Sequence, residues 1–344
     1  MFAATPCWYR MNLPLFQATQ RWACLAIFLA SLSSSSVAHA IDNIRVSYAS
    51  LSAAYMDHIC AMDKGYFREE DLNIEVIRAP GGVATPGLLS GQFHFSSSAS
   101  SAVSAAVRGG PVKVVYTNLS RPSYTLVSIK PDITSAKDLV GKKIAIASFG
   151  DTGHLSTLLY LKKMAVNPSS VLFIAVGRNE VRFPALISGA IDATPLTVRD
   201  VVALKDQKHF VLADLSKEIQ LVWNGVAVSS KLLAENSQLV ERFLRGLAKG
   251  REFARRHRDE TIAFIGKRDA SPLAAIRIDY EVTKASMTED GSLPDDVLKD
   301  EVATRADLTK VAVANRPNFS ALFDYSITRR NYAQLKAAGW QPAR

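Results

Sequence analysis

The sequence contains an internal repeat, which restricts the folds that are open to this chain. TPGLLSGQFHFS (85–96) and FPALISGAIDAT (183–194) align at an offset of 98 and share a proline, a leucine, a serine and a glycine. Upstream, IRVSYAS (44–50) and IAIASFG (144–150) lie 100 residues apart, and each is an apolar run that ends in small residues. The similar spacing of both pairs predicts two similarly built halves within one chain.

Each copy contains the same order of predicted elements. The first copy is expected to form a strand at 44–50, a helix at 52–64, a strand at 73–77, a helix that Pro86 opens and a short strand. The second copy is expected to form a strand at 144–150, a helix at 152–165, a strand at 171–176, a helix that Pro184 opens and a short strand. Gly91 and Gly189 end the two proline-opened helices. This order predicts an α/β fold with two parallel-sheet lobes.

Five serines fall between Ser96 and Ser101, where the first copy changes from strand to helix. Residues 92–95 alternate polar and apolar side chains with the period of a strand, and apolar residues then recur at helical spacing until Gly109. The free N–H groups at a helix N-terminus, with hydroxyls beside them, form a cradle for a small polar or anionic group. Ordinary N-capping by a serine is the alternative.

Ligands of open α/β sheets bind beyond the carboxyl ends of the strands, near helix N-termini. The repeat therefore predicts a cleft between two sets of loops, which are 51–54, 81–83 and 96–98 in the first copy and 148–154, 177–179 and 194–196 in the second. Together with side chains near the connections, the expected ligand-binding residues are Ser52, Ala53, Gly82, Ser96, Ser97, Ser98, Arg121, Gly150, Asp151, Thr152, Gly153, His154, Arg178, Asn179, Thr194, Trp223 and Asn224.

Two extended segments, 124–129 and 223–228, are expected to connect the halves as hinge strands. After Ser229 the pattern becomes mostly helical, and these helices, including one at about 272–287, are expected to complete the first half and pack behind its sheet. The predicted organisation is a signal peptide at 1–40, a first lobe formed by 41–127 and 229–344, and a second lobe formed by 128–228.

The first forty residues have the layout of a secretory signal peptide. An apolar run, WACLAIFLASL (22–32), follows Arg10 and Arg21. This run is too short to span a bilayer, and Ala38-His39-Ala40 fits the small-x-small cleavage pattern. We expect cleavage after about Ala40 and a periplasmic mature protein.

Cysteine content and charge are consistent with export. Of three cysteines only Cys60 follows the expected cleavage site, so we expect no disulfide within the mature chain, as is common for proteins of the bacterial periplasm. The formal net charge is +9, and the densest basic run, 255–258, is expected at a helix end, where cations offset the helix dipole. We therefore expect a monomer with no nucleic-acid partner.

Motifs of catalysis and metal binding are absent from the sequence, which contains no HExxH, CxxC pair, GxSxG or GxxxxGK[ST] pattern. His58 and Cys60 are two residues apart on a predicted helix and therefore face different sides. His94 is expected to be structural, whereas His154 is the histidine expected in the cleft. We expect no enzyme activity, no metal and no cofactor.

Arginines determine the expected ligand class. Arg121, Arg178, Arg182 and Arg199 lie in or near the predicted loops of the cleft. A guanidinium group binds a carboxylate, a sulfonate or nitrate through paired hydrogen bonds. These residues favour a small organic anion, and solvated surface arginines are the alternative.

Other side chains leave a heteroaromatic ligand open. Aromatic residues that could stack on a flat ring are Tyr55, Tyr124, Phe149 and Trp223. Asp151 and Asp192 could accept the N–H donors of a pyrimidine. The sequence therefore leaves two chemical classes of solute open.

Five stretches resemble the solute-binding proteins of ABC importers. KGYFREEDLNIEVI (64–77) resembles the family's KGYF-x-E-G-L-x-V-E-V signature, with Asp71 in place of the usual glycine, and DITSAKDLVGKKIAIASFG (132–150) resembles its KDL-x-GKK stretch. The two SG-containing segments of the repeat resemble its AL-x-SG-x-VD motifs, with His94 at one aspartate position, and 323–340 also has the family's character. The closest group is the nitrate/sulfonate/taurine-type proteins, which share a fold with thiamine-pyrimidine-precursor binders.

This resemblance implies a type II periplasmic-binding-protein fold, in which two hinged lobes close around a solute. It also implies an extracytoplasmic receptor that delivers the solute to an ABC permease with a cytoplasmic ATPase. Three alternatives stay open: a binder of pyrimidine thiamine precursors, a sensor that signals to a membrane kinase, and an enzyme like the pyrimidine-synthesising relatives. The export signal and the missing Cys/His cluster count against the enzyme.

Overall fold

The computed structural model describes residues 41–49, 51–79, 81–177 and 179–342. The predicted signal peptide lies outside the described residues. Within them, no helix is both long enough and apolar enough to cross a membrane.

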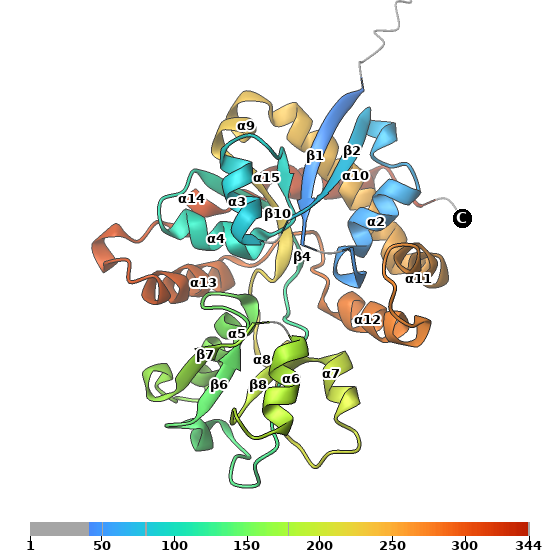
Figure 1. Cartoon of the computed structure of the whole chain (residues 1–344). Helices are drawn as coiled ribbons and strands as arrows, with labels where there is room; N and C mark the ends of the chain where they lie inside the picture. Colours follow the sequence, from blue (N-terminus) through green and yellow to red (C-terminus); the bar gives the residue numbers. More distant parts are fainter. Residues whose placement is uncertain (1–40, 50, 80, 178, 343–344) are drawn as a thin grey trace, which may run out of the picture. The chain divides into compact units, whose positions relative to one another are not determined.

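The first copy of the repeat forms a five-stranded sheet with strand order β2-β1-β3-β10-β4 (Figure 1). Its strands are β1 (Asp42–Tyr48), β2 (Leu72–Arg78), β3 (Phe95–Ser96), β4 (Val112–Leu119) and β10 (Asn224–Ser229). The strands of the repeat run parallel, as predicted, whereas β10 pairs antiparallel to β3 and β4. β10 runs the other way because it enters from the second half without a crossover helix.

Helices cover both faces of this sheet. They are α2 (Met56–Asp63), α3 (Gly81–Leu89), α4 (Ala99–Val107), α9 (Ser230–Glu235), α10 (Ser237–Arg256), α11 (Arg258–Gly266), α12 (Leu273–Ser286), α13 (Asp295–Leu308), α14 (Phe319–Leu322) and α15 (Ser326–Ala337), with the short helices η1 (Ala53–Tyr55), η2 (Arg68–Glu70) and η5 (Val313–Asn315). Val46, Val115 and Val226 belong to the hydrophobic core that includes α2 and α10, whereas Val114 and Ala227 belong to the core that includes α4 and α13. Neighbouring strand residues thus enter opposite cores, which is the two-residue period of a buried sheet.

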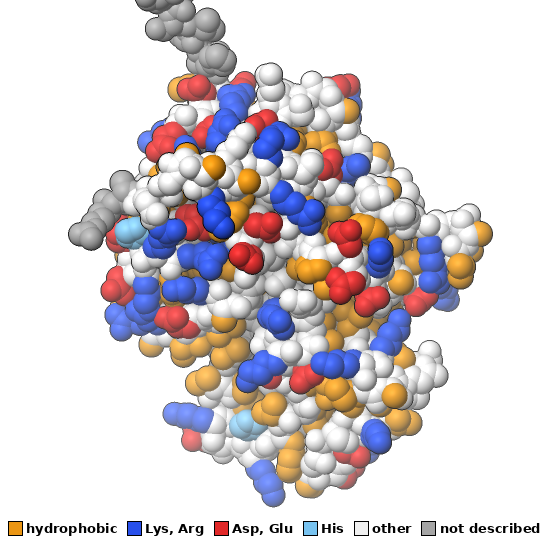
Figure 2. Space-filling model, turned by 180° about the vertical axis from the view of Figure 1, so that it is seen from behind, with side chains coloured by type: hydrophobic (Ala, Val, Ile, Leu, Met, Phe, Trp, Pro, Cys, Tyr) orange, Lys and Arg blue, Asp and Glu red, His pale blue; other side chains and the backbone are white. Residues whose placement is uncertain are grey.

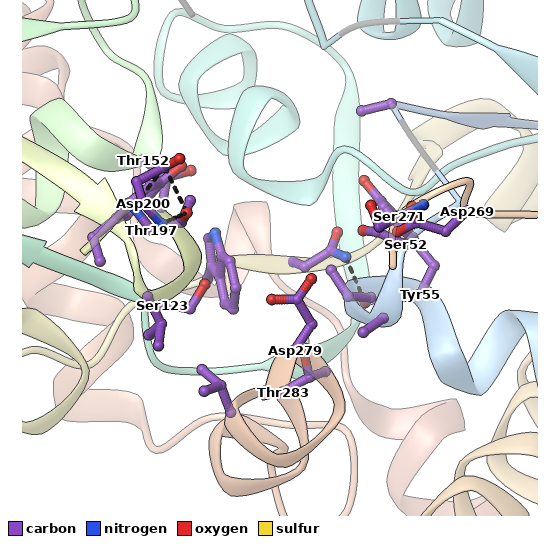
Figure 3. Close-up of a pocket in the computed structure, with 18 of the residues that line it drawn as sticks. Ser52, Tyr55, Ser123, Thr152, Thr197, Asp200, Asp269, Ser271, Asp279 and Thr283 are labelled. Carbon is purple, nitrogen blue, oxygen red and sulfur yellow. Dashed lines mark hydrogen bonds between the residues drawn. The ribbon is translucent and has the colours of Figure 1, made fainter. Parts of the chain in front are cut away.

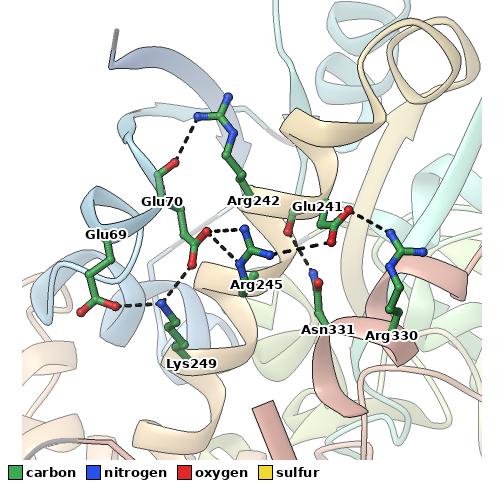
Figure 4. A network of polar contacts seen from close by, with 8 residues as sticks. All are labelled: Glu69, Glu70, Glu241, Arg242, Arg245, Lys249, Arg330 and Asn331. Atoms are coloured by element: carbon green, nitrogen blue, oxygen red, sulfur yellow. Dashed lines mark hydrogen bonds and ion pairs between the residues drawn. The ribbon is translucent and has the colours of Figure 1, made fainter. Parts of the chain in front are cut away.

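Ion pairs fix α10 to η2 and to α15 (Figure 4). The buried carboxylate of Glu70 accepts hydrogen bonds from Arg245 Nε and Lys249 Nζ, each at 2.9 Å. On the other side of the helix, Glu241 pairs with Arg330 at 2.9 Å. Because the charge of Glu70 is compensated twice, its burial is tolerated and α10 is anchored.

The basic run at 255–258 falls where α10 ends and α11 begins, as predicted. Arg256 pairs with Glu252 at 3.3 Å, and Arg258 pairs with Glu281 at 2.6 Å. On the face that Figure 2 displays, lysines and arginines are interspersed with aspartates and glutamates. The run is therefore a helix terminus with acidic partners.

The second copy repeats the strand order of the first. Its elements are β5 (Tyr124–Ser128), η3 (Ala136–Leu139), β6 (Lys143–Ile146), α5 (Thr152–Lys163), η4 (Pro168–Ser170), β7 (Leu172–Ala175), α6 (Asn179–Ile187), β8 (Thr194–Thr197), α7 (Val198–Ala203), β9 (Phe210–Asp214) and α8 (Leu215–Glu218). β6 pairs parallel to β7, and β5 pairs antiparallel to β8 and β9. A bridge from Ile144 to Ala193 joins these two small groups of strands into one sheet, which we call the second sheet. The resulting order, β7-β6-β8-β5-β9, matches the first sheet position by position and confirms the repeat.

The proline-opened helices begin earlier than the sequence predicts. α3 begins at Gly81 and contains Pro86 in its interior, and α6 begins at Asn179 and contains Pro184 in its interior. Each proline removes one hydrogen bond to the carbonyl four residues earlier. For Pro86 that carbonyl belongs to Gly82, close to the start of the helix, so the remaining bonds keep the helix intact.

The chain passes between the two sheets at 120–123 and again at 219–223. All of β5 lies in the second sheet and all of β10 in the first, so the expected lobe boundary at residue 127 falls inside β5. The two connections bind each other, because Leu221 N donates to Ser120 O at 2.9 Å.

Candidate ligand-binding cavity

A cavity of about 790 Å³ is lined by both copies of the repeat (Figure 3). The first half contributes Ala49, Ser52–Tyr55, Ser98, Ser100 and Ser101; the second half contributes Thr152, Phe183, Pro184, Thr197, Val198, Asp200 and Ala203. Residues 123–124 and 223–224 line it from the two connections, and Asp269, Ser271, Asp279, Val282 and Thr283 line it from α12 and the loop before it. The cavity therefore lies beyond the carboxyl ends of β1, β3, β6 and β8, where the repeat predicts a cleft.

Six of the predicted ligand-binding residues line this cavity. They are Ser52, Ala53, Ser98, Thr152, Trp223 and Asn224. Two of the aromatic candidates, Tyr55 and Tyr124, line it as well.

The other predicted residues lie elsewhere. Gly82, Gly150, Asp151 and His154 line a second cavity, Arg121 lines a third, and Ser96, Ser97, Gly153 and Thr194 line none of these three cavities. Arg178 and the side chain of Asn179 are not among the parts of the chain that the structure describes. The second cavity, of about 1290 Å³, shares Ser101 with the first and is lined mainly by α3, α4, α5 and α13.

The serine stretch divides into structural and cavity-lining members. Ser97 is buried and its Oγ donates to Ser47 O at 2.8 Å, and buried Ser96 Oγ accepts from Ser98 N at 3.2 Å. Ser98 occupies the N-cap position of α4 but makes no side-chain capping bond. Ser98 therefore lines the cavity without capping the helix, whereas the hydroxyls of Ser96 and Ser97 hold the turn.

Two asparagines position the cavity wall next to η1. Ala54 O accepts hydrogen bonds from the side-chain amides of Asn118 and Asn224, each at 3.0 Å. Asn118 also lies 3.4 Å from Asp57, whose second oxygen accepts from Tyr116 at 2.8 Å. These buried polar bonds fix the backbone beside Tyr55.

The N-terminus of α5 is closed by its own sequence. Asp151 accepts hydrogen bonds from His154 N and Ser148 N, each at 2.7 Å. His154 Nδ1 accepts from Gly150 N at 2.9 Å. Burial lowers the pKa of His154, which the nearby Asp151 only partly opposes, so the ring is neutral at pH 7.

The two predicted arginines whose side chains the structure describes, Arg121 and Arg182, do not line the cavity. Arg121 donates to Ser216 O at 3.0 Å, and Arg182, which is buried, donates to Thr194 Oγ1 at 3.2 Å and to Pro195 O at 2.9 Å. The side chain of Arg199, like that of Arg178, is outside the described set. Among the side chains that the structure does describe in the cavity wall, no lysine or arginine occurs.

The described charges of the cavity wall are carboxylates. Asp200, Asp269 and Asp279 line it, and Asp200 also forms a capping box with Thr197 at the start of α7. Asp192, one of two carboxylates that could accept the N–H donors of a pyrimidine, binds Lys130 and accepts from Lys143 N at 2.6 Å. The wall thus combines carboxylates with hydroxyl groups and with the rings of Tyr55, Tyr124, Phe183 and Trp223.

Sequence reasoning missed the contribution of α12. As expected, this helix packs into the core of the first sheet through Ile276 and Tyr280, but it also carries Asp279 and Thr283, which line the cavity. α12 contacts both η1 and α7, which places it beside the cavity. Thr197-x-x-Asp200, also missed, carries the capping-box pattern and was detectable from the sequence.

No group of three or more metal-ligating side chains occurs within the described part of the chain. His58 and Cys60 are both buried, and their polar contacts are with Asp57 and Thr261 respectively. Burial raises the pKa of the Cys60 thiol to about 12, so this cysteine is a protonated core residue.

Comparison with known proteins identifies structural relatives. The aliphatic sulphonate binding protein SsuA of Escherichia coli aligns with a TM-score of 0.68 at 16% identity, over 85% of this chain and 99% of that protein. The alkanesulfonate-binding protein SsuA of Xanthomonas axonopodis pv. citri, solved with MOPS bound, aligns with a TM-score of 0.65 at 19% identity, over 83% and 100%. These similarities establish the periplasmic-binding-protein fold.

Sequence comparison gives a curated relative and a family. The riboflavin-binding protein RibY of Chloroflexus aurantiacus is 28% identical over 210 residues, and the match spans 57% of this chain and 57% of that protein. The model of the NMT1/THI5 like family matches residues 53–261, which is more than half of the chain. The chain therefore belongs to the NMT1/THI5-like family.

Proposed function

We propose that this protein is an extracytoplasmic solute receptor that binds a small molecule in the cavity shared by the two copies of the repeat. In this proposal each copy forms the sheet of one lobe, and closure of the lobes encloses the solute. The protein acts as a monomeric binding component with no catalytic step. The single observation that carries the proposal is the cavity itself, which both copies line beyond the ends of equivalent strands.

Export and delivery complete the proposed role. The leader sequence supports secretion with cleavage after about Ala40 and a periplasmic location. An ABC permease with a cytoplasmic ATPase is the proposed recipient of the solute, because the resemblance to importer receptors covers nearly the whole mature sequence. A membrane sensor kinase is the alternative recipient, since it would need only the same closure.

The chemistry of the cavity favours a flat, nitrogen-rich heteroaromatic solute. Tyr55, Tyr124 and Trp223 supply faces on which a ring can stack, and Asp269 and the hydroxyl groups supply acceptors for N–H groups. Three carboxylates in the wall would repel a sulfonate or carboxylate and raise the free energy of its binding. A pyrimidine with an exocyclic amine, or a flavin, has the required shape and donors.

A small organic anion is the second candidate. The sulfonate-binding structural relatives support it, and so do Arg178 and Arg199, which in the sequence flank a predicted cleft loop and follow Thr194-Pro195, respectively. This candidate and the first make opposite predictions for simple probes.

The test is a thermal-shift and calorimetric comparison of residues 41–344 with 4-aminopyrimidine, riboflavin and ethanesulfonate. A solute that binds only the folded state raises the free energy of unfolding, by about 2.7 kcal/mol at one hundred times its Kd, and therefore raises the melting temperature. We expect a heteroaromatic probe to bind, Trp223→Ala to abolish binding, and the exposed, distant Val313→Ala to leave it unchanged. Binding of ethanesulfonate alone would replace the heteroaromatic proposal with the anion, and silence from all three probes would count against the heteroaromatic and sulfonate proposals alike.

A further inference from the structure

A buried ion pair on α13 connects the start of α4 with one of the two connections between the sheets, the segment 219–223. Glu301 and Arg305, one helical turn apart, are 1% and 2% exposed. Arg305 donates to Glu301 Oε1 from Nε at 2.9 Å and from Nη2 at 2.7 Å. Two charges are stable in a protein interior only when their remaining polar atoms also have partners, so those partners are informative.

Glu301 binds one of the two connections between the sheets. Its Oε2 accepts a hydrogen bond from the backbone N of Val222 at 2.7 Å. Val222 is fully buried, and the next residue, Trp223, lines the ligand-binding cavity. The preceding residue, Leu221, binds the other connection. The carboxylate therefore holds the chain where the two connections meet.

Arg305 binds the wall of the cavity. Its Nη2 donates to Ser100 Oγ at 2.8 Å, and its Nη1 donates to Ser104 Oγ at 2.6 Å. Both serines lie on α4, and Ser100 lines the cavity. Because a guanidinium holds its partners in one plane, the first turns of α4 are fixed relative to α13.

These contacts form a continuous chain of hydrogen bonds from Ser100 through Arg305 and Glu301 to the backbone of Val222. A shift of the first turn of α4 would break the buried hydrogen bond from Arg305 to Ser100 unless α13, and with it the connection, shifted too. The cavity wall and the connection are therefore expected to move together.

We propose that Glu301 and Arg305 are positioning residues that couple the start of α4 to the connection between the lobes, so that a solute touching α4 biases closure. The inference rests on the proposed function, because closure is the step that it regulates. Coupling between two sites is reciprocal, so loosening the wall must also loosen the connection. That reciprocity can be measured without any solute.

Amide hydrogen exchange on residues 41–344 provides the test. Ser100→Ala removes the hydrogen bond of Arg305 to the serine that lines the cavity and leaves its bond to Ser104, and we expect exchange over 219–224 to accelerate about tenfold. Ser101→Ala is the matched control, because Ser101 lines the same cavity but has no bond to Arg305 in the structure. We expect this control to leave exchange over 219–224 unchanged. Equal protection of 219–224 in the two variants would overturn the proposal.

A second pair of variants separates coupling from a general loss of stability. Glu301→Gln keeps the side-chain size but removes the charge, and we expect 98–104 and 219–224 to exchange faster together. Glu70→Gln weakens the ion-pair network of α10 and should leave both segments protected. Acceleration of only one segment in Glu301→Gln would also overturn the proposal. Because no solute is present, failure of the ligand panel would not change these results.

Discussion

The two copies of the repeat share a strand order but treat their helix N-termini differently at the cavity. In the first copy, Ser98 occupies the N-cap position of α4 and Ser52 that of η1, and neither makes a side-chain capping bond. In the second copy, Asp151 caps α5, and Thr197 with Asp200 forms a capping box on α7. The helix starts of the first copy therefore lack carboxylate caps, whereas those of the second copy have them. Of these two carboxylates, Asp200 lines this cavity and Asp151 lines the second cavity.

This difference indicates how a solute would be oriented. Helix N–H groups without a side-chain acceptor favour the acceptor atoms of a ligand, and carboxylates favour its N–H donors. A heteroaromatic ring with both kinds of group would direct its acceptors toward α4 and its amine toward α7. Duplication of a fold thus provides two similar sets of helix starts, and substitutions there give them different capping groups.

The largest expected effect concerns the core of the first half, which depends on a helix outside the repeat. Phe243 of α10 stacks on Phe95 at 4.0 Å and on Phe67 at 5.1 Å between ring centroids. We expect Phe243→Ala to lower the free energy of unfolding by about 3–5 kcal/mol, because it leaves a cavity among fully buried rings. Urea denaturation measures this change, and the exposed Val313→Ala is the control. A loss near that of the control would show that α10 is not essential to this core.

An intermediate effect tests the difference in capping directly. Asp151→Ala removes bonds to two backbone N–H groups and should lower the free energy of unfolding by about 1 kcal/mol. Ser98→Ala, at an N-cap position of the first copy, removes no capping bond and should cost only a few tenths of that. Equal losses in chemical denaturation would remove the distinction between the two walls.

The smallest expected effect is on the pH dependence of stability. The pKa of His154 in the folded state lies below its ordinary value of 6.5, so the unfolded chain binds a proton more readily. Stability should therefore fall as the pH is lowered below about 6.5. His154→Gln should flatten this fall without abolishing it, because the pKa of His94 is also lowered by burial and by Arg45. Identical slopes for wild type and variant between pH 7.5 and pH 5 would contradict this assignment.

Much of the fold was predictable because it is recorded in local patterns. Apolar runs that end in small residues indicated β1 and β6. Asp71 replaces a glycine of the family signature, and it adopts the left-handed conformation that favours glycine (φ 54°). The helix starts were predicted at Pro86 and Pro184, but both prolines lie inside their helices. A proline inside a helix removes only one backbone hydrogen bond, so the helix can begin before it. Where the chain crosses between the sheets was misjudged by a few residues, because a connection and an edge of a strand share the same extended pattern.

The candidate site was less predictable. Loops named by the repeat supplied Ser52, Ser98 and Thr152, but a one-residue step directs Ser97 into the interior and leaves Ser98 at the cavity. Asp279 is far in sequence from the repeat, and only tertiary packing brings it to the wall. Arg121 and Arg182 lie away from the cavity because side-chain reach cannot be inferred from position in a loop, as buried Arg182 illustrates.

The central claim, closure of two lobes around a solute, is tested most directly by the distance between them. Spin labels at Val140→Cys and Val313→Cys, both exposed positions, would report it by pulsed electron resonance, since the buried thiol of Cys60 should not react. We expect whichever of 4-aminopyrimidine and riboflavin binds more tightly to shift the distance distribution to a second, discrete population. A distribution that stays unchanged at saturating concentrations of the bound probe would contradict it.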